Sequence, residues 1–155
     1  MPVVSRAIFG FLRLASRRGL AAAKDGESGK ERARRHGIAG ETYAYWYLRR
    51  HGYIFVARNY RVAGDKAEID LVGYDGDVLA FVEVKTRSGS KERPGQPEEA
   101  VTAEKRFHVE RMARRFLSER RITGAAWRFD VVAIESRSGS APQVRLHKNA
   151  FAANL

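Results

Sequence analysis

The stretch AEIDLVGYDGDVLAFVEVKTR, residues 67–87, decides the fold because it predicts two strands joined by a tight turn. Apolar residues dominate 67–73 and again 78–86, and Asp75-Gly76 between them is a strong β-hairpin signal. We place a two-residue loop at Asp75-Gly76. Both faces of the second strand are apolar, so we expect this strand to be covered on both sides.

Four charged residues enter this hairpin in two pairs, Glu68 with Asp70 and Glu83 with Lys85. Residues two apart in a strand share a face. In the expected register Asp70 lies opposite Phe81 and Glu68 opposite Glu83, and directly opposed residues lie on the same face. All four charged side chains are therefore expected to project from one face of the hairpin.

A cluster of carboxylates in an apolar sheet is costly unless the charges are paired or metal-bound. Asp and Glu oxygens suit Mg²⁺ or Mn²⁺, with Asp70, Glu83 and Glu68 as the candidate ligands. The chemistry such a site supports is phosphodiester hydrolysis, in which Lys85 orients the attacking water or neutralises developing charge. The alternative is an ion-pair ladder on a half-exposed hairpin with no catalytic role.

Periodicity and turn signals extend this hairpin into an α/β domain with the order α-β-β-β-α-β, a mixed β-sheet flanked by helices. The polar loop at 88–97 is either a DNA-contacting flap or a plain connection. We expect helices at 33–50 and 98–119, strands at 53–58, 67–73, 78–86 and 127–134, and a short edge strand at 143–147.

The chain has 155 residues, no cysteine and a net charge of +11. This length favours one compact domain, and the lack of cysteine excludes disulfides and cysteine-based zinc sites. The strong positive charge indicates a polyanionic partner such as DNA, RNA or an anionic membrane. No apolar run approaches the roughly 20 residues that a membrane-spanning helix needs.

Residues 1–30 are expected to be a basic, flexible N-terminal extension, and residues 31–155 the domain itself. Residues 1–35 hold nine Lys/Arg and three Asp/Glu, so +6 of the net charge of +11 lies there. Ile8, Phe11, Leu12 and Ala15 would share one face of a helix. A disordered arm, a surface-seeking amphipathic helix and a targeting peptide all remain open.

Several separated motifs recur in order over residues 36–152. They are Gly37-Ile-Ala-Gly-Glu41, Gly52-Tyr-Ile, Arg58-Asn59-Tyr60, Glu68-Ile-Asp70-Leu71, Phe81-Val-Glu-Val-Lys-Thr-Arg87, Ala100-Val101 with Lys105, Arg128-Phe-Asp130-Val131 and Asn149-Ala-Phe151. On these motifs the chain resembles the YraN-like family of small, mostly uncharacterised bacterial proteins. That family is similar to the PD-(D/E)xK nucleases and to Holliday-junction resolvases, which implies a restriction-endonuclease-like fold.

The resemblance also implies roles for individual residues. Asp70 matches the motif aspartate, Glu83 and Lys85 match the E-x-K, and Glu41 matches the helical acid that often completes such sites. Apart from the resemblance, Arg87 follows the E-x-K on the same strand face and could hold a substrate phosphate bidentately, and Lys105 could contact a phosphate or simply extend outward to water. A homodimer is expected by analogy with the resolvases.

We therefore expect a cytoplasmic, Mg²⁺- or Mn²⁺-dependent endonuclease acting on DNA, with branched or single-stranded forms as candidate substrates. A catalytically silent nucleic-acid-binding module with the same fold is the alternative, because a fold alone does not establish activity. A third hypothesis is an accessory protein whose basic N-terminal arm docks a membrane or a partner. We expect Asp130 to be structural and paired with an arginine.

Overall fold

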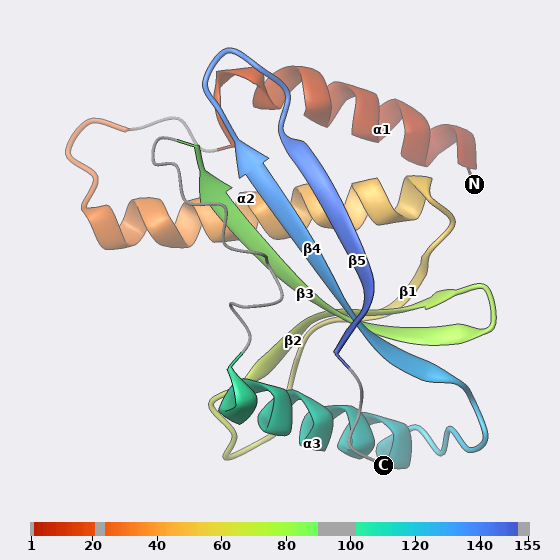
Figure 1. Cartoon of the computed structure of the whole chain (residues 1–155). Helices are drawn as coiled ribbons and strands as arrows, with labels where there is room; N and C mark the ends of the chain where they lie inside the picture. The colour runs from red at the N-terminus through yellow and green to blue at the C-terminus, as the bar shows by residue number, and fades with distance from the viewer. Residues whose placement is uncertain (1, 21–23, 90–101, 152–155) are drawn as a thin grey trace. The chain divides into compact units, whose positions relative to one another are not determined.

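The computed structural model of the chain describes residues 2–20, 24–89 and 102–151 (Figure 1). Its elements are α1 (Pro2–Ala15), the short 3-10 helix η1 (Ser16–Arg18), α2 (Gly29–Arg50), β1 (Ile54–Arg61), β2 (Glu68–Asp75), β3 (Val78–Ser88), α3 (Ala103–Glu119), β4 (Trp127–Ser136) and β5 (Gln143–Phe151). Each predicted strand and helix is present. Residues 90–101 lie outside the described part of the chain. They include most of the predicted loop at 88–97 and the first residues of the predicted helix at 98–119.

The strands form one five-stranded mixed sheet in the order β1-β2-β3-β4-β5, and helices flank it. This arrangement confirms the predicted α/β class and is consistent with a restriction-endonuclease-like fold. None of the helices within the described ranges combines the length and the apolar character needed to cross a membrane.

The chain divides into two compact units. The first comprises Met1–Gly52, Val84–Arg93 and Val132–Arg145, and the second comprises Tyr53–Glu83, Pro94–Val131 and Leu146–Leu155. The predicted boundary between residues 30 and 31 falls inside α2. The division into an extension and a domain stays a prediction.

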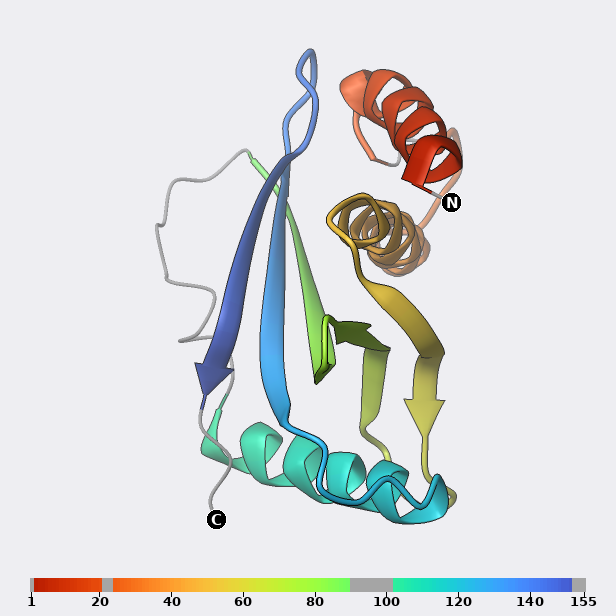
Figure 2. The same ribbon diagram turned by 90° about the vertical axis from the view of Figure 1, so that its right-hand side faces the viewer.

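In the first unit, α2 begins earlier than we expected because Ser28 and Glu31 form a capping box. The Ser28 hydroxyl accepts from the Glu31 backbone N–H, and the Glu31 carboxylate accepts from the Ser28 backbone N–H at 2.9 Å. These bonds satisfy donors that a helix N-terminus otherwise leaves unpaired. Both views show α1 lying beside α2 (Figures 1 and 2).

In the second unit, the hydrophobic core lies between α3 and the strands. Val109, Met112 and Phe116 form the buried face of α3, as the periodicity predicted. The Phe116 ring makes an edge contact with Phe81 of β3 at 5.8 Å between centroids. This packing sets the position of β3, the strand that carries the candidate site, against α3.

Candidate functional site

The β2–β3 hairpin has a different register from the one we predicted. Asp75 pairs with Val78, so the two loop residues are Gly76 and Asp77 instead of Asp75 and Gly76. Gly76 has a φ of 61°, which suits the first loop position of a type II′ turn and which glycine adopts at little cost. Moving the loop by one residue moves every pair by two, and Phe81 consequently lies opposite Val72 instead of Asp70.

This shift brings the two central acids to equivalent positions on neighbouring strands. The ladder between β2 and β3 ends with the pair Leu71 and Val82. The residues that follow on the two strands are Asp70 and Glu83. The predicted pairing of Glu68 with Glu83 is therefore wrong, and Asp70 is the acid that comes level with Glu83 where the two strands stop pairing.

Strand β2 departs from strict alternation around Asp70. Ile69 and Val72 are three residues apart, yet both belong to the cluster of buried side chains that contains Phe81. Residues three apart in a regular strand point to opposite faces, so the alternation is interrupted between them. Asp70 lies in this interrupted stretch and is only 7% exposed.

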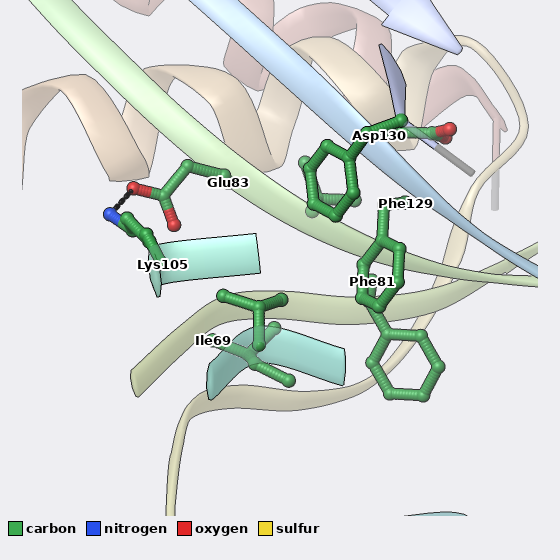
Figure 3. Close-up of a pocket in the computed structure, with 9 residues that line it drawn as sticks. Ile69, Phe81, Glu83, Lys105, Phe129 and Asp130 are labelled. Carbon is green, nitrogen blue, oxygen red and sulfur yellow. Dashed lines mark hydrogen bonds and ion pairs between the residues drawn. The ribbon is translucent and has the colours of Figure 1, made fainter. Parts of the chain in front are cut away.

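Glu83 is held by a lysine from α3. The Lys105 ammonium donates to Glu83 Oε1 in a short ion pair (Figure 3). The Glu83 side chain is 12% exposed and the Lys105 side chain 36%. Because Glu83 is so enclosed, this partner offsets much of the cost of keeping a carboxylate out of water. The structure pairs Lys105 with a carboxylate, and its contact with a phosphate stays a prediction.

The space beside this ion pair is apolar and small. Ile69, Phe81, Val109 and Phe129 line a cavity of about 10 Å³ next to Glu83 and Lys105. Figure 3 shows the Glu83 carboxylate turned toward Lys105, away from the two labelled phenylalanine rings. A cavity of this size holds one water at most. It is a small gap in the packing beside Glu83 and is too small to bind a nucleotide.

Glu68 has a different environment from the other acids. Its carboxylate accepts from Arg61 Nε of β1 at 2.7 Å, and its side chain is 33% exposed. A surface ion pair of this kind contributes little to stability. Glu68, one of the three predicted metal ligands, is thus held by an arginine at the surface.

The remaining predicted site residues belong to the first unit. Glu41 lies on α2, and Lys85 and Arg87 lie on β3. The buried Gly40 packs against Thr86: a Cβ at residue 40 would lie 2.9 Å from Thr86 Cβ. This close approach brings the helix turn that carries Glu41 against the stretch of β3 between Lys85 and Arg87.

A second charged cluster, which we did not predict beyond the Asp130 pairing, lies in the second unit. Arg128 Nε donates to Asp130 Oδ1 at 2.8 Å, and its Nη2 donates to Asp75 at 2.5 Å. Tyr53 donates to Asp130 at 3.1 Å, and Lys148 donates to Asp75 at 2.6 Å. Asp130 is 1% exposed, and its ion pair with Arg128 confirms the predicted pairing with an arginine.

The charges in this cluster shift the pKa values of its members. Hydrogen bonds from Lys148 and then Arg128 lower the pKa of Asp75. Burial, followed by the negative charge of Asp130, raises the pKa of Tyr53. The hydrogen bond to Asp130 raises the pKa of Arg128. Asp75 and Arg128 therefore stay charged and Tyr53 stays protonated at neutral pH.

The donor set around Asp70 and Glu83 can be tested against the metal that the sequence predicted. Among the residues that the structure describes, no three His, Cys, Asp or Glu side chains gather as a ligand set. Mg²⁺ and Mn²⁺ sites in enzymes need fewer than three protein ligands, because Mg²⁺ commonly takes one or two carboxylates and keeps several waters. Asp70 and Glu83 on adjacent strands therefore fit such an ion in number and in chemistry.

Comparison with known proteins gives one consistent match. The model of the uncharacterised protein family UPF0102 matches residues 40–134. A UPF0102 protein of Solibacter usitatus is 44% identical over 116 residues, which are 75% of this chain and 85% of that protein. A UPF0102 protein of Symbiobacterium thermophilum is 45% identical over 77% of this chain and 98% of its own length. All seven predicted site residues lie within the matched range.

Proposed function

The chain belongs to the uncharacterised protein family UPF0102, also known as the YraN family, and we propose that it is a metal-dependent endonuclease that hydrolyses phosphodiester bonds in DNA. The observation that carries this proposal is the position of Asp70 and Glu83, each directly after the last pair of the β2–β3 ladder, with Lys85 two residues further along β3. This is the order of acids and lysine that the E-x-K resemblance requires.

Each residue has a role in the proposed reaction. Asp70 and Glu83 bind the cation, which would supply Lewis-acid polarisation of the scissile phosphate. Lys85 orients the attacking water or neutralises charge that develops on the phosphate oxygens. The family resemblance gives Glu41 the role of the helical acid that supports such sites, and Arg87 would bind a phosphate through its planar pair of donors.

Lys105 has a further role that follows from its ion pair with Glu83. While no cation is bound, its ammonium neutralises a largely enclosed carboxylate. If Glu83 held a cation, Lys105 would no longer be its counter-charge and could contact a substrate phosphate. The same lysine would then serve the metal-free and the substrate-bound enzyme.

The direct test is cleavage of supercoiled, single-stranded and four-way-junction DNA with Mg²⁺ or Mn²⁺. We expect the wild type to cleave and D70A, E83A and K85A to lose activity by at least about a hundredfold, with DNA binding retained. Glu104→Ala is the matched control, because Glu104 is an acid on α3 whose side chain is 86% exposed. Equal activity in Glu83→Ala and the control would refute the assignment.

Metal binding gives a second readout that does not depend on turnover. Titration of Mn²⁺, followed by electron paramagnetic resonance, should show about tenfold tighter binding to Lys105→Met, because a competing charge-assisted hydrogen bond is removed. Weaker binding to Lys105→Met would mean that Lys105 positions Glu83 for the metal instead of competing with it.

The alternative function is a nucleic-acid-binding module without catalysis. It is supported by one observation, the ion pair with Lys105 that already balances the charge of Glu83. DNA binding by the wild type with neither cleavage nor Mn²⁺ binding would favour this module. Sedimentation equilibrium of the same samples tests the homodimer that we propose for a cytoplasmic, resolvase-like enzyme.

A further inference from the structure

Helix α1 is anchored to α2 by one face. Phe9 is 4% exposed, and its ring lies 5.1 Å from the Tyr43 ring and 5.8 Å from the Tyr47 ring of α2. Ser5, one turn before Phe9, is 3% exposed. This inward face accounts for the attachment of α1 within the first unit.

The opposite face of α1 is apolar and exposed to solvent. Val3, Val4, Phe11 and Leu14 are 76%, 60%, 71% and 62% exposed. They follow helical spacing, with Phe11 seven residues after Val4 and Leu14 three residues after Phe11, so they form one stripe. Eight large hydrophobic side chains are exposed in the described part of the chain, and half of them lie in this one 14-residue helix. Such a concentration indicates an interaction surface.

Arginines accompany this stripe, and no acid does. Arg6 and Arg13 are exposed and seven residues apart, which places them on one flank of the helix. Arg13 and Arg17 also line an open hollow with Arg145, beside the connection between β4 and β5. Residues 2–18 contain no Asp or Glu. The flank of the stripe is therefore uniformly positive.

We propose that α1 docks the protein on the surface of an anionic phospholipid bilayer. An apolar stripe beside a row of cations is the pattern of helices that lie in the membrane interface, with apolar side chains among the acyl chains and cations at the headgroups. A DNA duplex would use the arginines but gives Phe11 and Leu14 nothing to contact. The arginines and the apolar stripe together therefore favour a bilayer, whose surface is negative and whose interior is apolar.

Helix α1 can be tested separately from the family domain and from the candidate site. The family match begins at residue 40, so α1 lies outside the part of the chain that the family model describes. The proposal is also independent of the nuclease proposal, because no residue of α1 belongs to the candidate site.

The test is flotation of the purified full-length chain with two kinds of vesicle, phosphatidylcholine alone and phosphatidylcholine with 30% phosphatidylglycerol. We expect binding to the anionic vesicles, reduced on the order of 100-fold in the double variant F11S/L14S, because each buried apolar side chain contributes about tenfold. Phe107→Ser is the matched control: Phe107 is 64% exposed on α3 and belongs to the other unit. This control should bind as the wild type does.

Each other outcome overturns the proposal. Absence of binding to either vesicle means that α1 is not a membrane anchor. Equal loss in F11S/L14S and Phe107→Ser means that the stripe has no special role. If the wild type is a dimer that F11S/L14S dissociates and vesicles do not bind, then the stripe joins two copies of the chain. Circular dichroism of both variants should match the wild type, since the substituted side chains are exposed.

Discussion

A single methyl group at residue 40 should disrupt the contact between α2 and β3. The Cβ of Gly40→Ala would lie 2.9 Å from both Cβ and Cγ2 of Thr86 and closer still to its Oγ1. Rotation about χ1 of Thr86 can move Oγ1 and Cγ2, but Cβ is attached to the backbone of β3. The helix or the strand must therefore move.

The expected magnitude follows from two opposing effects. Alanine is favoured over glycine inside a helix by about 0.8–1 kcal/mol. Overpacking a close contact typically costs 1–3 kcal/mol, and we take the upper end because the clash includes backbone-attached atoms. The net loss in the free energy of unfolding is about 2 kcal/mol, or about 4–8 °C in Tm for a chain of this size.

The matched control is Gly37→Ala on the same helix, because a Cβ there meets nothing within 4 Å. It should receive only the helix-propensity gain and raise Tm by about 2–4 °C. Thermal unfolding followed by circular dichroism measures both. In a Thr86→Gly background, Gly40→Ala should lose most of its cost, since the clashing atoms are gone. If Gly40→Ala is as stable as Gly37→Ala, the proposed contact between α2 and β3 is refuted.

Three further predictions concern charged and polar groups. Asp130→Asn should lower the free energy of unfolding in urea by about 3 kcal/mol, because Arg128, whose side chain is 16% exposed, loses one of its two carboxylate partners. The lowered pKa of Asp75 contributes stability at neutral pH that disappears as the pH falls below the ordinary value of 3.8, so the stability gap between wild type and Asp75→Asn should shrink in acid; an unchanged gap at pH 2.5 would contradict this. Burial, then the hydrogen bond to Glu119, raises the pKa of Tyr60 to about 12. The folded state therefore holds a proton that the unfolded state releases above about pH 10, so the wild type should lose more stability between pH 10 and 12 than Tyr60→Phe does, and equal losses would contradict this.

The sequence predicted the elements well because local patterns encode them. The α3 stripe of Val109, Met112 and Phe116 has the spacing of one helix face, and the structure buries all three. The order of strands followed from apolar runs separated by turn signals. The start of α2 was missed although its signal was present, since Ser28 and Glu31 have the spacing of a capping box.

The hairpin register could not be read reliably because two overlapping dipeptides compete for the turn. Asp75-Gly76 suits a type I′ turn and Gly76-Asp77 a type II′ turn, and both require glycine in the left-handed region. The structure uses the second. The predicted register was wrong by two residues, which leaves each side chain of the paired stretch on its predicted face. The residue level with Glu83 on β2, however, is Asp70 instead of Glu68.

The Lys105 ion pair was beyond sequence reasoning for a different reason. Glu83 and Lys105 are 22 residues apart, and only the packing of α3 on the sheet brings them together. Periodicity places Lys105 on the inward stripe of α3, one turn before Val109, but it does not say which strand residue that stripe meets. A lysine on the apolar stripe of a helix must find a counter-charge or extend to water. In a sequence with acids on a neighbouring strand, such a lysine is therefore the signal for an ion pair. Here it finds the acid of the E-x-K sequence, and the proposed exchange between Lys105 and a cation follows from that contact.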